Sequence, residues 1–164
     1  MVSIEQVLSW LGEVSDPEIP VISIVDLGVV RQVAWAGHAC EIVITPTYSG
    51  CPAMKVIAEA VRDKLRANGV EEVNIVSRLS PAWTTDWISE TGKAALKDYG
   101  IAAPVGRAID ISGITRRAGV SPRVPCPQCG SERTRLVSQF GSTPCKALYQ
   151  CMECREPFDY FKVH

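Results

Sequence analysis

The feature that most constrains this chain is a pair of C-x-x-C motifs near its C-terminal end. They are Cys126-Pro-Gln-Cys129 and Cys151-Met-Glu-Cys154, and 21 residues separate them. Two thiolates in one tight turn can reach the same ion, and two such turns complete a tetrahedral site with Zn–S bonds of about 2.3 Å. Since so short a segment buries little apolar surface, a bound metal would supply much of its folding free energy. We therefore expect residues 125–164 to form a four-cysteine zinc ribbon.

The metal in this ribbon and the role of a fifth thiol stay open at the level of sequence. Four thiolates also hold iron–sulfur clusters, although structural zinc is the commoner occupant of paired C-x-x-C motifs. Cys145 lies between the two motifs, where it could be a spare ligand, a partner contact or a small buried hydrophobe. A closed set of four thiolates leaves no position for a substrate, so we expect no catalysis at the ribbon.

Charge and hydropathy exclude several classes of partner. The formal net charge is −1, which creates no strong field toward nucleic acid or an anionic membrane. No apolar run approaches the ~18 residues of a membrane-spanning helix, and the N-terminal segment lacks the basic start and apolar centre of a signal peptide. Five of the seven cysteines fall in the last 39 residues, and such clusters in a reducing compartment favour metal over disulfides. We expect a cytoplasmic protein with no nucleic-acid or membrane partner.

Upstream of the ribbon, hydrophobic periodicity predicts an α+β domain with a small β-β-α-β core and flanking helices. The expected elements are a helix over 3–11, strands over 29–35 and 39–45, a helix from Pro52 that stops at Asn68-Gly69, a strand over 71–79 and a helix from Ser89 to about Gly100. The strand–helix–strand unit should cross over right-handed and pair its strands in parallel. We place this domain over 1–105 and a connector, with a short strand at 108–114, over 106–124.

Cys51 is the candidate functional residue of the first domain. It precedes Pro52, and proline favours the first helical position, so Cys51 is expected at the N-cap. Free N–H groups and the helix dipole would then lower the pKa of its thiol. The alternative is that Cys51 caps the helix and is buried without further function.

Carboxylates and hydroxyls that could share a site with Cys51 lie in two loops. The acidic loop carries Asp16, Glu18 and Asp26, and the loop before Cys51 carries Thr45 and Thr47. Together they would give mixed oxygen and sulfur ligands for a metal. The commoner use of an Asp-Pro-Glu sequence is to cap a turn, and that alternative stays open.

The sequence lacks the motifs of several metal-dependent and nucleotide-binding protein classes. Neither His38 nor His164 follows an acidic residue by three positions, so no Glu-x-x-His pair of a di-iron carboxylate core exists. The chain has no G-x-G-x-x-G and no P-loop, which argues against nucleotide binding through those motifs. Trp83 and Trp87 could form an exposed docking surface, although tryptophans are more often core residues.

The motifs of the first domain resemble a known family. Asp-Pro-Glu-Ile-Pro at 16–20, Val-Asp-Leu-Gly at 25–28 and the T-x-T-x-x-x-C-P loop at 45–52 resemble the small iron–sulfur assembly domain shared with SufT. The segment at 80–102 resembles the end of that domain, so the resemblance covers about residues 1–105. It implies that Cys51 and the acidic loop form the functional site.

The ribbon narrows the resemblance to the PaaD family, accessory subunits encoded with phenylacetyl-CoA epoxidase. The matching segments are CPQCGS, FGSTPCKALYQC and CREPFDYFK. This likeness implies a non-catalytic maturation factor that binds iron or an iron–sulfur cluster transiently and supplies it to the reductase or the di-iron oxygenase component. A homodimer is compatible with that role. The alternatives are a zinc-stabilised docking subunit of the oxygenase complex and, less favoured because no base is placed beside Cys51, a thiol enzyme.

Overall fold

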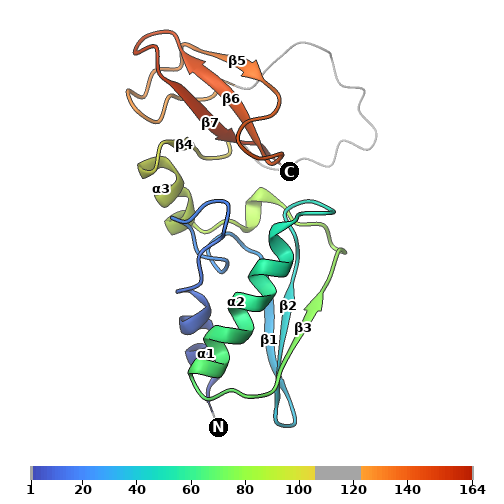
Figure 1. Cartoon of the computed structure of the whole chain (residues 1–164). Coiled ribbons are helices and arrows are strands. Elements are labelled where there is room, and N and C mark those ends of the chain that lie inside the picture. Colours follow the sequence, from blue (N-terminus) through green and yellow to red (C-terminus); the bar gives the residue numbers. More distant parts are fainter. Residues whose placement is uncertain (1, 106–122, 164) are drawn as a thin grey trace. The chain divides into compact units, whose positions relative to one another are not determined.

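The computed structural model describes residues 2–105 and 123–163 of the chain. These residues form two compact units, and the chain passes from the first to the second between Trp83 and Lys93 (Figure 1). The first unit comprises the residues up to Trp83 together with Trp87–Gly92, and the second comprises Thr84–Asp86 together with the chain from Lys93 onward. The strand expected at 108–114 and the terminal His164 lie outside the described residues. The mixed α+β class expected from the sequence is confirmed.

The first unit begins with the expected helix, α1 (Ile4–Leu11). Ser3 is its N-cap, and the Ser3 hydroxyl accepts from the Gln6 N–H while the Gln6 side chain accepts from the Ser3 N–H. This reciprocal capping box satisfies two N–H groups that the helix cannot pair internally. Val7 and Leu11 are fully buried on the inner face of the helix.

The sheet of the first unit has the order β1-β2-β3 (Figure 1). Strands β1 (Val30–Ala36) and β2 (Ala39–Ile44) form an antiparallel hairpin around the predicted turn at Gly37. Strand β3 (Val73–Ser77) pairs with β2 in parallel, as a strand–helix–strand connection predicts. Apolar side chains of the sheet and helices make one core, whose members include Ile42, Ile44, Ile57, Val61 and Leu65.

The connection between β2 and β3 is α2 (Ala53–Ala67), a 15-residue helix that lies alongside the sheet (Figure 1). Its N-cap is Pro52 and not Cys51, and no side chain caps it. The prediction that Cys51 is the N-cap is therefore wrong by one residue. Pro52 already has helical backbone angles, with φ −69° and ψ −21°, and as a proline it has no N–H that would need a partner at the helix start.

The short turn η1 (Thr85–Trp87) and the helix α3 (Glu90–Asp98) follow. The Ser89 hydroxyl accepts from the Gly92 N–H, which caps the helix as expected. The division between the two units falls inside α3, and the domain limits expected from the sequence stay predictions.

The second unit holds a four-stranded sheet of order β4-β7-β6-β5. Strands β5 (Thr134–Ser138), β6 (Lys146–Cys151) and β7 (Pro157–Phe161) are antiparallel, and β4 (Ile101–Ala102) adds a parallel edge to β7. The core of this sheet joins Ala102 and Val124 to the aromatic side chains of Tyr149, Phe158 and Tyr160. Residues before the first cysteine motif thus contribute to the ribbon's sheet.

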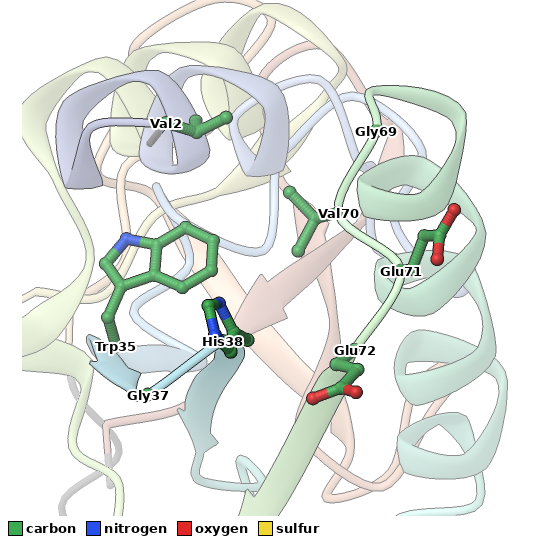
Figure 2. A pocket seen from close by; sticks show the side chains of 8 residues that line it. All are labelled: Val2, Trp35, Gly37, His38, Gly69, Val70, Glu71 and Glu72. Carbon is green, nitrogen blue, oxygen red and sulfur yellow. The ribbon is translucent and has the colours of Figure 1, made fainter.

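The first unit also has a pocket of about 350 Å³, which lies where the β1–β2 turn meets the α2–β3 connection (Figure 2). Within the part of the chain that the structure describes, no helix is both long and apolar enough to cross a membrane.

Candidate functional site

The four cysteines of the two C-x-x-C motifs converge in the second unit. Their sulfur atoms all lie within 4.8 Å of one another. The Sγ atoms of Cys126 and Cys154 are 3.7 Å apart, and those of Cys129 and Cys151 are 3.6 Å apart. A tetrahedral ZnS₄ centre with bonds of about 2.3 Å has S···S edges of about 3.8 Å. The sulfur positions therefore fit zinc, and Cys126, Cys129, Cys151 and Cys154 form a closed metal site that would stabilise the ribbon.

The two motifs have the same backbone geometry. In the first, the Cys126 N–H donates to the Ser131 carbonyl at 2.9 Å, and in the second the Cys151 N–H donates to the Glu156 carbonyl at 3.0 Å. Each turn then needs a left-handed residue directly after its second cysteine. Gly130 takes this position with φ 75°, and Arg155 takes it with φ 67°, although left-handed backbone is unfavourable for a residue with a Cβ.

The metal-free thiols of the second motif differ in acidity. Burial acts to raise the pKa of Cys151, but N–H donors of Cys154 and Glu153 and the neighbouring thiols outweigh it and lower this pKa to about 7. The Glu156 N–H acts to lower the pKa of Cys154, yet burial and the surrounding cysteines raise it to about 12. Zinc binding must therefore displace protons from this set, because the metal binds thiolates.

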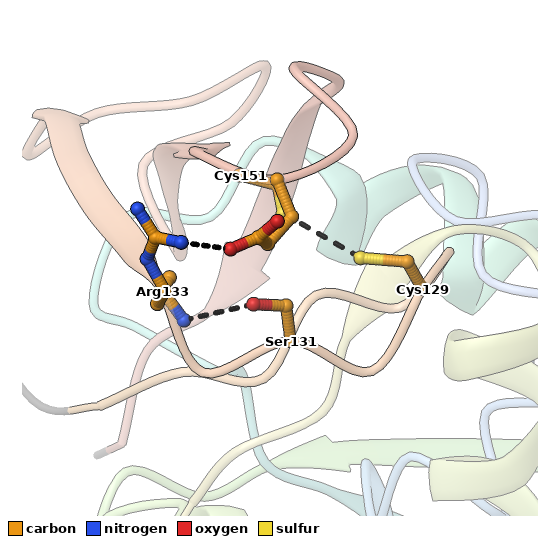
Figure 3. A network of polar contacts seen from close by, with 5 residues as sticks. Cys129, Ser131, Arg133 and Cys151 are labelled. Carbon is orange, nitrogen blue, oxygen red and sulfur yellow. Dashed lines mark hydrogen bonds and ion pairs between the residues drawn. The ribbon is translucent and has the colours of Figure 1, made fainter.

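Polar side chains next to the two C-x-x-C motifs connect them (Figure 3). Arg133 pairs with Glu153 of the second motif, and the Arg133 N–H donates to the Ser131 hydroxyl of the first at 3.1 Å. Cys145 is not part of the cluster: it is buried, and its Sγ lies 3.0 Å from the Thr143 hydroxyl oxygen. Of the alternatives for Cys145, a small buried side chain is the one that this geometry favours.

In the first unit, the acidic loop forms a tight turn around Asp16. This residue is 6% exposed, and its Oδ1 accepts from the N–H groups of Glu18 and Ile19 at 2.8 and 2.9 Å. Such an Asx turn fixes the loop backbone. The turn-capping alternative is thus realised at Asp16, and it fixes the Asp16 carboxylate and the loop backbone at Glu18.

In the structure, the Cys51 thiol is close enough to the acidic loop for the charges of the loop to act on its pKa. The negative charges of both Glu18 and Asp16 act on the Cys51 thiol, while the Ala53 N–H and the Tyr48 hydroxyl donate toward its sulfur. Burial is the largest effect on the pKa of Cys51, and together with the two carboxylates it raises this pKa above its usual value. The sequence-based expectation of a lowered pKa is wrong, because a helix N-terminus cannot offset a half-buried thiol that faces two acids.

Other predicted site residues have structural contacts. Both Asp26 oxygens accept hydroxyl donors, from Ser89 at 2.6 Å and from Ser23 at 2.8 Å, so Asp26 joins the loop to the start of α3. Thr45 is buried at the end of β2, where its N–H donates to the Val29 carbonyl, and Thr47 is half-buried in the loop before Cys51.

The two tryptophans do not form an exposed docking surface. Trp83 is 4% exposed, and its indole N–H donates to the Leu27 carbonyl at 2.9 Å. Trp87 is half-buried beneath the Arg31 guanidinium, whose carbon lies 3.5 Å from the ring centre. The core interpretation of Trp83 is confirmed.

Comparison with known proteins agrees with both units. Residues 112–162 match the family model of the PaaD zinc beta ribbon domain. The chain is 46% identical over 159 residues, 97% of its length and 92% of the relative's, to an Escherichia coli (strain K12) protein that is provisionally named as one of the subunits of 1,2-phenylacetyl-CoA epoxidase. The chain belongs to the PaaD family. As a PaaD-family protein it carries its zinc ribbon behind a second domain, since residues 4–76 match the family model of iron–sulfur cluster assembly proteins.

Relatives of the first unit alone also exist. An Fe-S protein maturation auxiliary factor of Porphyromonas gingivalis (strain ATCC BAA-308 / W83) is 38% identical over 88 residues, which are 52% of the PaaD-family chain and 83% of that protein. A crystal structure of a DUF59 domain from Bacillus anthracis superposes with a TM-score of 0.52 at 32% identity, covering 56% of this chain and 89% of that one. These likenesses support an accessory role related to iron–sulfur protein maturation.

Proposed function

We propose that this protein is a maturation factor that supplies iron or an iron–sulfur cluster to a component of the phenylacetyl-CoA epoxidase. The observation that carries the proposal is the juxtaposition of Cys51 with Glu18 and Asp16 in a domain of the iron–sulfur assembly family. A thiol and two carboxylates are ligand types that iron accepts. The iron or cluster is cargo, and the zinc of the ribbon is structural.

The raised pKa of Cys51 suits a transient ligand. At neutral pH the thiol keeps its proton when the site holds no iron, and iron must displace that proton to bind. Protonation of the sulfur therefore competes with the metal and favours release. Glu18 lies on a loop whose backbone Asp16 fixes, so its carboxylate can contact the same ion without a large rearrangement. Tyr48 donates toward the sulfur and would steady it.

The client is a protein that itself needs iron. The reductase and the di-iron oxygenase component of the epoxidase are both candidates. The ribbon would serve to hold the client, because its four thiolates leave zinc no open position for a reaction. The protein is then an accessory subunit without a catalytic step of its own.

The test is the iron content of the client purified from cells. Cells that lack this protein are complemented with wild type, with Cys51→Ser, or with Ser49→Ala, a matched change at an exposed residue of the same loop. The proposal predicts that the client contains too little iron in cells with Cys51→Ser, although the abundance and the zinc content of that variant are normal. Ser49→Ala should restore full iron loading of the client. Full iron loading of the client with Cys51→Ser would refute it.

A second function is favoured by a different observation, the closed zinc ribbon. If the protein only holds the oxygenase components together, then Cys51→Ser is silent and Cys129→Ser, which opens the metal site, disperses the complex. Co-purification of the epoxidase components with each variant separates the two functions.

A further inference from the structure

The pocket of the first unit lies away from the Cys51 site. Cys51 precedes the N-cap of α2, whereas Gly69 and Val70, which line the pocket, follow the last residue of that helix. A helix of 15 residues is about 22 Å long, so the two places are at opposite ends of α2. What binds in the pocket is therefore a separate question from what Cys51 carries.

The wall of the pocket is apolar and aromatic. Figure 2 shows the Trp35 indole and the His38 imidazole next to each other on the side of the β1–β2 turn, with Val70 on the side of the α2–β3 connection. Val2 also lines the cavity. An indole beside aliphatic side chains offers a π-face and a surface for methylene groups.

Apart from the His38 imidazole and the Trp35 indole N–H, the polar side chains of the pocket are acidic. Glu71 and Glu72 contribute two exposed carboxylates, and none of the lining residues is a lysine or an arginine. Within residues 2–105 and 123–163, no ion pair occupies either carboxylate. The pocket lies at the C-terminal end of α2, where a helix carries partial negative charge, although the last turn also carries Lys64 and Arg66. The pocket therefore favours a cation.

Two glycines line the pocket. Gly37 in the β1–β2 turn and Gly69 after α2 both have left-handed backbone, with φ 64° and 85°. A Cβ built on either one would meet no atom within 4 Å. Both glycines line the cavity, and neither has a side chain that would narrow it.

We propose that this pocket binds an arginine side chain of a partner protein. The planar guanidinium would stack on the Trp35 indole and donate to the Glu72 carboxylate, and its methylene stem would pack on Val70. The Glu71 carboxylate points to the other side of the chain (Figure 2) and adds only its charge. A bare metal ion fits less well, since the cysteine set is the only group of three or more clustered ligand side chains among the described residues. An anion would meet the Glu71 and Glu72 carboxylates and a helix C-terminus, and neither a lysine nor an arginine lines the pocket.

The test is an NMR titration of the full, zinc-loaded protein with Nα-acetyl-arginine methylamide. The Trp35 indole N–H has no hydrogen-bond partner among the described residues, and its resonance reports on the wall of the pocket. The matched probe is the corresponding citrulline derivative, which has the same shape and no charge. We expect saturable shifts at the Trp35 indole and the Gly37 and Gly69 amides with the arginine probe, at millimolar affinity, and none with citrulline.

Variants of the pocket's glutamates test the electrostatic contribution to binding of the arginine probe. Glu72→Gln should weaken binding of the arginine probe by roughly two- to fivefold, the range of one exposed ion pair, and Glu71→Gln should weaken it less, because that carboxylate points to the other side of the chain. Glu59→Gln, an exposed change elsewhere on α2, should leave its affinity unchanged. Both carboxylates are exposed, so folding is preserved, and unchanged amide shifts outside the pocket verify this. Equal responses to the two probes, no response, or equal affinity in all variants would overturn the proposal.

Discussion

Arg155 provides a quantitative test of the backbone geometry of the second C-x-x-C turn. It has φ 67° at the position that Gly130 occupies in the other motif, directly after the second cysteine. Left-handed backbone costs a residue with a Cβ about 1–2 kcal/mol. Arg155→Gly removes this penalty but adds about 0.4–1 kcal/mol of chain entropy in the unfolded state. The net stabilisation of the folded ribbon is then about 0.5–1 kcal/mol.

This gain should appear in zinc affinity. Because metal binding and folding of such a ribbon are coupled, stabilising the folded form by that amount tightens zinc binding about two- to fivefold. The Arg155 carbonyl, which accepts from the Gln150 side chain at 3.2 Å, is retained in the variant. The assay is competition for zinc against a chromophoric chelator at constant pH and ionic strength.

The matched control is Gly130→Ala, with φ 75° at the equivalent position and open space around the new Cβ. The same balance with opposite sign predicts zinc binding about two- to fivefold weaker, and the double variant should lie near wild type. Zinc affinity that falls in Arg155→Gly would refute the reasoning, since it would show that the arginine side chain contributes more than its backbone costs.

Three further predictions follow from the two units. Cys129→Ser should abolish zinc binding and leave the ribbon's amides unprotected in hydrogen exchange, while β1–β3 stay protected; protection of the ribbon without zinc would contradict this. Gly28→Ala should destabilise the first unit by more than about 3 kcal/mol in urea denaturation, because φ is 77° and the new Cβ would lie 2.7 Å from backbone, whereas Gly37→Ala, with open space, should cost only about 1 kcal/mol. Glu18→Gln removes a negative charge that raises the pKa of Cys51, so this pKa falls, the thiolate fraction at neutral pH rises and alkylation of Cys51 accelerates; an unchanged alkylation rate would place Glu18 away from the thiol.

The metal site and the main elements could be predicted because their signals are local. The spacing of the cysteines is enough to bring Cys126 and Cys129 into one turn, and the capping box at Ser3 and Gln6 marks the start of α1. The β-hairpin and the parallel pairing of β2 with β3 follow from strand periodicity and chain connectivity in the same way.

What the sequence could not show depends on distant contacts. The pKa of Cys51 is set by burial and by carboxylates more than 30 positions away in the chain, which no local pattern reveals. The two-residue strand β4 is too short to have a period, and it exists because β7 offers it an edge. Asp26 resembled a ligand in the motif, yet its oxygens serve two serine hydroxyls.

The measurement that tests the central claim most directly is iron and acid-labile sulfide per chain, with zinc counted in the same samples. Wild type, Cys51→Ser and Ser49→Ala are loaded anaerobically with ferrous iron and sulfide and then desalted. The account predicts one zinc in all three, from the four-cysteine ribbon, and iron that is retained by wild type and Ser49→Ala but lost in Cys51→Ser. Equal iron in Cys51→Ser and wild type would contradict the account, because the cargo would then bind elsewhere in the chain.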